Sequence, residues 1–152
     1  MIDPETAALV EEIRAEYPGC FACGTSNPVG LHLSPADLQG DVAVAHFRPI
    51  DHHAGAGNTL HGGLAATVLD EIMVWAAILT HRVLAVTGTL DVRFRRPVAV
   101  DEEDITVTGR VDDRSGKRLR CRGSLEVAGV TAVTATGLYL VSRTFGDSSE
   151  TL

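Results

Sequence analysis

The hydrophobic pattern of the chain changes sharply near residue 64. From Leu64 to Leu79 nearly every side chain is apolar, and only Thr67, Asp70 and Glu71 interrupt the run. A helix that is apolar on all sides is typical of the buried centre of a domain. The pattern therefore predicts a buried central helix, opened by His61-Gly62-Gly63.

The segments after this helix are strand-like. We predict strands over residues 83–96, 105–112, 118–127 and 130–142, with Ala128-Gly129 as a tight turn between the last two. One buried helix followed by antiparallel strands predicts an α+β fold, with a sheet wrapped around a central helix.

The segments before the central helix are shorter. Residues 4–17 predict an amphipathic helix capped by Asp3, and the Cys20 to Gly30 stretch is rich in turn-forming residues. Residues 31–33 and 41–47 predict strands, and residues 51–60 a loop. The chain is thus expected to form a single domain over residues 1–142, with an N-terminal helix in residues 1–19 and a flexible tail over 143–152.

Composition and charge narrow the class of protein. A net charge of −7 and an aromatic content of 5% disfavour binding to nucleic acid or to an anionic membrane surface. The apolar run around Ile72 to Leu79 is too short to span a membrane, and the polar, acidic N-terminus lacks a secretory pattern. Three cysteines fit a reducing compartment, so we expect a cytoplasmic protein.

Asp70 and Glu71 are the candidate reactive residues of the central helix. Burying an unpaired carboxylate is costly, and neighbours on a helix point about 100° apart, so the two acids cannot share one environment. One interpretation makes Asp70 a hydrogen-bonded structural acid and Glu71 a solvated one. The other makes Asp70 a general base or nucleophile in a pocket.

The glycines that open the helix point to ligand binding. Gly62 and Gly63 are poor helix formers, but their bare N–H groups at a helix N-terminus can bind a substrate oxygen as an oxyanion hole. A plain, tightly packed turn is the alternative. Gly62 and Asp70 lie roughly 12 Å apart along one helix, so a single carbonyl cannot reach both. If both serve one substrate, two copies of the chain must share each site.

The sequence resembles the hotdog-fold thioesterase superfamily, in particular its phenylacetate-pathway-like (PaaI-like) branch. The resemblance covers roughly residues 18–142 and is carried by the segments 58–71 (NTLHGGLAATVLDE), 87–97 (TGTLDVRFRRP) and 20–31 (CFACGTSNPVGL). It implies a hotdog fold, a homodimer or homotetramer, and hydrolysis of an acyl-CoA thioester without a cofactor.

The resemblance also implies roles for individual residues. Asp70 would attack the thioester or activate water, and Gly62 of the partner subunit would polarise the carbonyl. Thr87 would orient the water or carboxylate, and His61 would support the carbonyl or its loop. Further candidates for substrate contacts are Gly63, Asn58 and Glu71. Many relatives carry Asn six residues before the histidine, whereas this chain has Gly55 there and Asn58 nearer.

Two further groups of residues are candidates for binding. Arg95 and Arg96 suit the phosphates of CoA, although a solvated sheet edge explains them nearly as well. Cys20 and Cys23 have metal-ligand spacing, but no second cysteine pair completes a tetrahedral site. We therefore expect two free thiols and no metal, with structural zinc as the alternative.

Two other functions remain open from the sequence. The first is a hotdog dehydratase or hydratase acting on acyl-CoA or acyl-ACP, although the family's Pro-rich segment before the helix is missing. The second is a non-catalytic acyl-CoA-binding protein. The sequence does not specify the acyl group.

Overall fold

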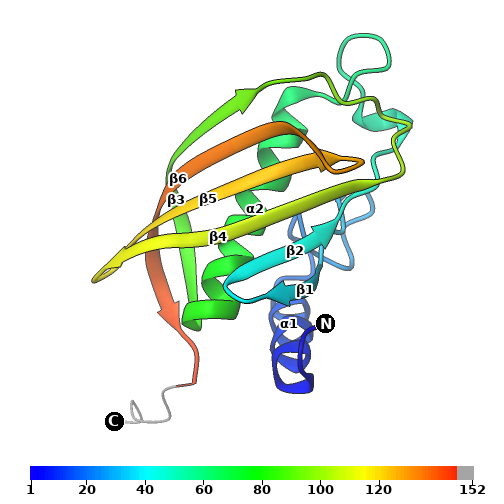
Figure 1. The fold of residues 1–152 in the computed structure, drawn as a ribbon. Helices are drawn as coiled ribbons and strands as arrows, with labels where there is room; N and C mark the ends of the chain where they lie inside the picture. Colours follow the sequence, from blue (N-terminus) through cyan, green and yellow to red (C-terminus); the bar gives the residue numbers. More distant parts are fainter. Residues whose placement is uncertain (147–152) are drawn as a thin grey trace.

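The computed structural model describes residues 1–146, in which a six-stranded antiparallel sheet curves around one long helix (Figure 1). The strands lie in the order β1-β2-β4-β5-β6-β3. The α+β arrangement predicted from the sequence is confirmed. In chain order the elements are α1 (Pro4–Glu16), β1 (Pro35–Gln39), β2 (Val42–His46), the 3-10 turn η1 (Asp51–His53), α2 (Gly62–His81), β3 (Val83–Phe94), β4 (Ile105–Ser115), β5 (Arg118–Val127) and β6 (Val130–Thr144).

The central helix α2 forms the core, as its apolar run predicted. Its ten buried residues are Ala65, Val68, Leu69, Ile72, Met73, Trp75, Ala76, Ala77, Ile78 and Leu79. By length and hydropathy alone α2 could cross a membrane, but 56% of its most apolar stretch is buried inside this domain. The core also takes in Val10 and Ile13 of α1 and three side chains of the loop that follows α1, namely Cys23, Leu31 and Leu33.

Two glycines of the sheet face the helix and let the two backbones approach closely. Gly109 of β4 and Gly123 of β5 are opposite each other in the ladder. A Cβ on Gly109 would lie 2.6 Å from the Ile72 carbonyl oxygen, and a Cβ on Gly123 would touch Leu69 and Met73. Only a residue without a side chain fits between the Gly109 backbone and the helix backbone.

Within residues 1–146, strand β3 pairs only with β6, so it is an edge strand, and it contains a bulge. Thr87 pairs with Tyr139 and Thr89 with Leu138, which leaves Gly88 as an extra residue without a partner. Side chains alternate between the two faces of a strand. The inward-facing positions are therefore odd-numbered before the bulge and even-numbered after it. Before it they are Val83, Ala85 and Thr87, and after it Leu90, Val92 and Phe94. Leu90 and Val92 pack against the core.

Several predicted boundaries differ from the observed ones. Residues 31–33 do not form a strand, because the N–H groups of Leu31 and Leu33 donate to carbonyls of the preceding loop. The strand at the β2 end of the sheet is β1 instead. β3 ends at Phe94, so residues 95–96 lie beyond it. β6 runs to Thr144, two residues into the predicted tail, and residues 147–152 of that tail lie outside the described part of the chain.

At two other boundaries, the start of α1 and the turn between β5 and β6, the structure agrees with the prediction from the local sequence. The Asp3 carboxylate accepts the Thr6 N–H at 2.9 Å and caps α1, as predicted. Ala128 and Gly129 both have positive φ, 48° and 78°, which is the backbone of a tight two-residue hairpin turn.

Candidate active site

Asp70 lies midway along α2, where two hydroxyl groups from neighbouring strands hold its carboxylate. Thr87 Oγ1 donates to Asp70 Oδ1 at 2.8 Å, and the Tyr139 hydroxyl donates to the same oxygen at 2.7 Å. Thr87 and Tyr139 are partners in the β3–β6 ladder, so one strand pair supplies both donors. Among residues 1–146 no side chain donates to Asp70 Oδ2, which leaves that oxygen available to water or substrate.

Tyr139 is the residue of this cluster that sequence reasoning missed. It is completely buried, and this burial raises its pKa, which the hydrogen bond to Asp70 raises further. The phenol therefore keeps its proton and acts as a donor to the carboxylate. The pairing of Tyr139 with Thr87 could have indicated its role, but strand register across the Gly88 bulge is not readable from the sequence.

The first turn of α2 presents one N–H group without a protein acceptor. His61 Nδ1 accepts the Gly63 N–H at 2.9 Å, so the imidazole proton is assigned to Nε2. The Leu64 and Ala65 N–H groups donate to the His61 carbonyl. In the described chain nothing accepts from the Gly62 N–H, and the helix dipole adds partial positive charge there. This geometry can bind the oxygen of a polarised carbonyl.

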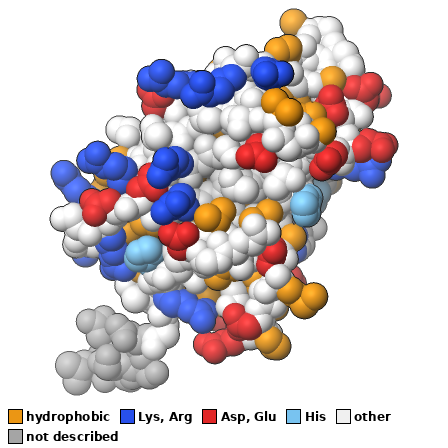
Figure 2. Space-filling model, in the orientation of Figure 1, with side chains coloured by type: hydrophobic (Ala, Val, Ile, Leu, Met, Phe, Trp, Pro, Cys, Tyr) orange, Lys and Arg blue, Asp and Glu red, His pale blue; other side chains and the backbone are white. Residues whose placement is uncertain are grey.

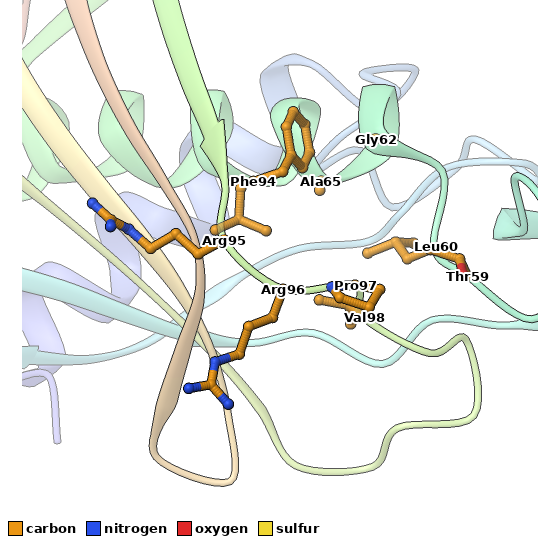
Figure 3. A pocket seen from close by; sticks show the side chains of 10 residues that line it. Thr59, Leu60, Gly62, Ala65, Phe94, Arg95, Arg96, Pro97 and Val98 are labelled. Atoms are coloured by element: carbon orange, nitrogen blue, oxygen red, sulfur yellow. The ribbon is translucent and has the colours of Figure 1, made fainter.

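A pocket of about 340 Å³ opens beside Gly62. Figure 3 shows Phe94 pointing toward Gly62 and Ala65 at the start of α2, with Arg95 and Arg96 extending from the segment that follows β3. Its volume lies in the range typical of small-molecule sites. The other lining residues are mostly apolar: Thr59, Leu60, Pro97, Val98 and Val133.

Arg95 and Arg96 both line this pocket because β3 has already ended at Phe94. Strand alternation would have placed them on opposite faces, but the chain bends there and both N–H groups donate to the Ala132 carbonyl. Figure 2 shows basic side chains over the sheet with acidic ones among them, and Arg110 and Arg122, for example, share Asp112. No acid in the described residues pairs with Arg95 or Arg96.

Three other residues singled out in the sequence, Asn58, Gly55 and Glu71, do not line this pocket. The Asn58 amide donates to Asp101 at 2.9 Å, which ties the loop before α2 to the loop after β3. Gly55 lies against His61, where a Cβ would be 3.2 Å from the His61 Cα. Glu71 faces the N-terminal loop at Cys20 and Cys23 rather than Thr87 and Tyr139.

Within one chain the candidate residues thus form two groups. Asp70, Thr87 and Tyr139 lie together at the middle of α2, whereas Gly62 opens the pocket with the two arginines. Asp70 and Gly62 are eight residues apart on a continuous helix, which is roughly 12 Å along its axis. One carbonyl cannot be held by both groups of the same chain.

Comparison with known proteins identifies the fold and a family. The family model described as "Thioesterase superfamily" matches residues 57–134, just over half of the chain, which spans α2 and most of the sheet. No curated protein sequence is significantly similar to this one.

Several solved structures with similar folds are described as thioesterase proteins, all of low sequence identity to this chain. Thioesterase superfamily member 2 from Mus musculus has a TM-score of 0.73 at 18% identity, over 91% of this chain and 98% of its own. A hypothetical thioesterase from Streptococcus pneumoniae, solved with coenzyme A, has a TM-score of 0.68 at 15% identity, over 74% and 90%. Another thioesterase superfamily protein has a TM-score of 0.74 at 22% identity; the match covers 80% of this chain but 62% of that longer protein. These structures support the hotdog fold expected from the sequence.

Proposed function

The chain belongs to the thioesterase superfamily, and we propose that it is an acyl-CoA thioesterase of the PaaI-like branch. Water and the thioester would give a free acid and the CoA thiol. The observation that carries this proposal is the carboxylate of Asp70, held at Oδ1 by Thr87 and Tyr139 and free at Oδ2. A fixed carboxylate with one free oxygen is suited to attack a thioester carbonyl or to take a proton from water.

The second half of each site would come from the partner subunit. Its Gly62 N–H stabilises the oxyanion that develops as the carbonyl is attacked, and the collapse of that intermediate expels the thiolate of CoA. Arg95 and Arg96 bind the CoA phosphates, because guanidinium groups pair well with phosphate. The coenzyme A in the Streptococcus pneumoniae structure supports this choice of substrate.

The edge strand β3 supports a homodimer. It is 12 residues long, no strand of the described residues pairs with its outer edge, and Val86 and Phe94 expose 54% and 57% of their surface. A long edge strand with exposed apolar residues is a site for pairing with another chain. Pairing there would bring Thr87 and Asp70 of one chain to the partner's copy of α2, as a shared site requires. Such dimers could pair further into tetramers.

The test is complementation between two inactive variants. Asp70→Asn removes the reacting charge but keeps the shape, and Gly62→Val obstructs the oxyanion N–H. A mixed dimer has one site with both lesions and one site with neither, so activity should return to at most about half of the wild-type value per mixed dimer. The assay is release of free thiol from a panel of acyl-CoA substrates.

The matched control mixes Asp70→Asn with Asp70→Ala. Both lesions fall on the carboxylate side, so every site in that dimer is damaged and no activity should return. If verified mixed dimers of folded Asp70→Asn and Gly62→Val chains stay inactive, the site is not shared. If Asp70→Asn itself retains near-wild-type turnover, Asp70 is not the reacting group. In a single turnover of the wild type in ¹⁸O-labelled water, label in the Asp70 carboxylate would establish nucleophilic attack, because water has then opened a mixed anhydride at the Asp70 carbonyl; a general base leaves Asp70 unlabelled.

A further inference from the structure

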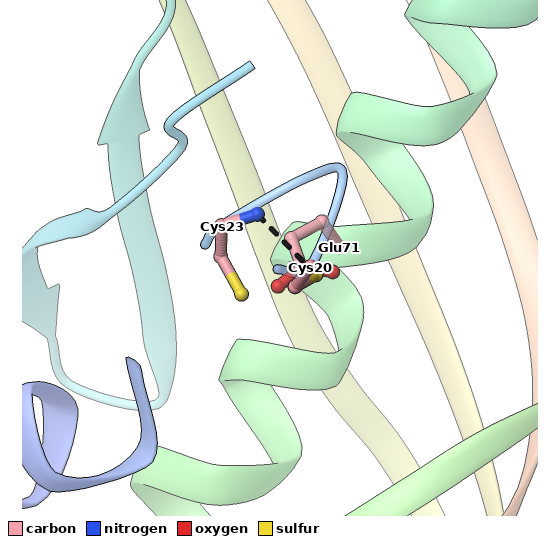
Figure 4. Close-up of side chains that lie close together, drawn as sticks. All are labelled: Cys20, Cys23 and Glu71. Atoms are coloured by element: carbon pink, nitrogen blue, oxygen red, sulfur yellow. Dashed lines mark hydrogen bonds between the residues drawn. The ribbon is translucent and has the colours of Figure 1, made fainter. Parts of the chain in front are cut away.

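A second cluster of reactive side chains lies where the loop after α1 meets α2, at Glu71, the residue that follows Asp70. The Cys20 and Cys23 thiols and the Glu71 carboxylate each offer an atom, and these three atoms all lie within 4.8 Å of one another. Figure 4 shows the two cysteines on the loop after α1, beside Glu71 on α2. The sequence had offered only the cysteine pair. The fold supplies a third ligand from a helix that begins almost forty residues later.

The loop that carries the cysteines is shaped around the Cys20 sulfur. The Cys23 N–H is directed at Cys20 Sγ at 3.5 Å, and the Gly24 N–H donates to the Cys20 carbonyl at 2.9 Å. A Cβ on Gly24 would lie 2.4 Å from the Pro18 carbonyl oxygen, so the loop closes this tightly only with glycine there. The loop therefore fixes the Cys20 sulfur beside the Cys23 backbone.

The cluster gathers three groups that can be anionic, without a cation to balance them. Burial raises the pKa of Glu71, and burial also raises the pKa of the Cys23 thiol. None of the basic side chains described forms an ion pair with Glu71; Arg14, whose Nε donates to the Cys23 carbonyl, pairs with Glu11 instead. Grouping such ligands inside a protein is costly unless protons or a metal ion neutralise them.

Trp75 gives a second, independent indication at the same place. It is one turn beyond Glu71 on α2 and 1% exposed, and its indole N–H has no hydrogen-bond partner among the residues described. The N–H is nevertheless close enough to Glu71 to lower the pKa of that carboxyl, against the larger effect of burial. Metal-bound carboxylates are commonly held by such outer donors.

We propose that Cys20, Cys23 and Glu71 bind one zinc ion per chain, with water as the fourth ligand. Two thiolates favour zinc over magnesium or calcium, which prefer oxygen ligands. Ligand atoms at 2.0–2.3 Å from zinc lie roughly 3.5–3.8 Å apart in a tetrahedron, so modest side-chain rotations would bring the three together. The ion would fasten the loop after α1 to α2, next to Asp70. This inference does not rest on the proposed thioesterase activity.

The test measures zinc in the purified protein. Chains produced with added zinc and dialysed in buffer without chelator should carry about one zinc per chain by mass spectrometry of the metal. Glu71→Gln keeps the size of the side chain but removes its charge, and it should lose the zinc under the same dialysis, as should Cys23→Ser. The matched control is Cys121→Ser, because Cys121 is another buried free thiol that lies on β5 outside the cluster. It should keep the zinc.

Two further measurements keep the inference falsifiable if a cysteine variant does not fold. Cobalt(II) in the wild-type protein should give thiolate charge-transfer absorption and the visible bands of a tetrahedral ion, and Glu71→Gln should lose or shift those visible bands. Added zinc should raise the thermal midpoint of the wild type but not that of Glu71→Gln. Wild-type protein that stays free of zinc after loading, folded Glu71→Gln that keeps the full zinc content, or a Cys20–Cys23 disulfide in the loaded protein would each overturn the site.

Discussion

Replacing Tyr139 by Phe tests how Asp70 is positioned. The change removes one oxygen atom, which lies 2.7 Å from Asp70 Oδ1, from a side chain that is completely buried. A hydrogen bond to a charged group contributes about 1.5–3 kcal/mol. The free energy of unfolding should therefore fall by about that amount, measured by urea denaturation at a fixed chain concentration.

The same loss should appear in catalysis. Without Tyr139 the carboxylate is held only by Thr87, on the exposed edge strand, and other side-chain conformations of Asp70 become accessible. If the whole loss of about 1.5–3 kcal/mol must be overcome to reach the reactive conformation, kcat should fall roughly ten- to a hundredfold. KM should change much less, because Tyr139 does not line the pocket beside Gly62.

The controls separate positioning from general damage. Tyr17→Phe alters the other tyrosine of the chain, which is 40% exposed, and stability should stay within about 0.5 kcal/mol. In an Asp70→Asn background, Tyr139→Phe should cost less, about 0.5–1.5 kcal/mol, because the acceptor is neutral. Unchanged kcat and unchanged stability in Tyr139→Phe would refute the claim that this hydroxyl holds Asp70.

Three further outcomes follow from the geometry. In the thiol-release assay, Thr87→Ala should lower kcat about tenfold or more, whereas Thr87→Ser, which keeps the hydroxyl, should stay near the wild-type rate. Equal rates for the two variants would contradict the role of the Thr87–Asp70 hydrogen bond. Gly109→Ala should lower the free energy of unfolding by about 1–3 kcal/mol, because its Cβ would lie 2.6 Å from the Ile72 carbonyl, whereas Gly19→Ala, with open space around it, should fold and denature like the wild type. Arg96→Ala should raise KM for acyl-CoA by about fivefold but leave KM unchanged for an N-acetylcysteamine thioester, which lacks the phosphates. The control is Arg48→Ala, because Arg48 pairs with Glu103. An equal rise in KM for both substrates in Arg96→Ala would argue against phosphate binding.

The sequence predicted the central helix and most of the sheet because both follow from local patterns. The all-apolar run marked α2, and β-rich segments marked the last four strands, one of which, β5, has the predicted bounds. The edge strand β1 was missed because its sequence, Pro-Ala-Asp-Leu-Gln, lacks β-formers and alternation, and its pairing with β2 decides its conformation.

The site was predictable only where its residues are close in sequence. Asp70 and Gly62 were found from their places on a buried helix. The hydroxyl of Tyr139 reaches Asp70 across 69 positions, and Glu71 meets cysteines about fifty positions earlier. Such contacts depend on how strands and loops are arranged around α2. Local propensities do not encode that arrangement in a readable form.

The bulge at Gly88 constrains how β3 can change in length. Thr87 and Phe94 are an odd number of residues apart, yet Thr87 reaches Asp70 and Phe94 lies where a Cβ on Gly62 would touch its ring at 3.3 Å. In an unbulged strand, positions seven apart point to opposite sides. A chain that keeps the bulge but gains or loses one other residue between them would turn either Thr87 or Phe94 outward, whereas a change of two residues, or loss of Gly88 together with its bulge, preserves the orientation of both. In alignments with relatives, a single-residue gap in this stretch therefore marks either a strand without the bulge or a rebuilt site, and a two-residue gap marks only a strand of different length.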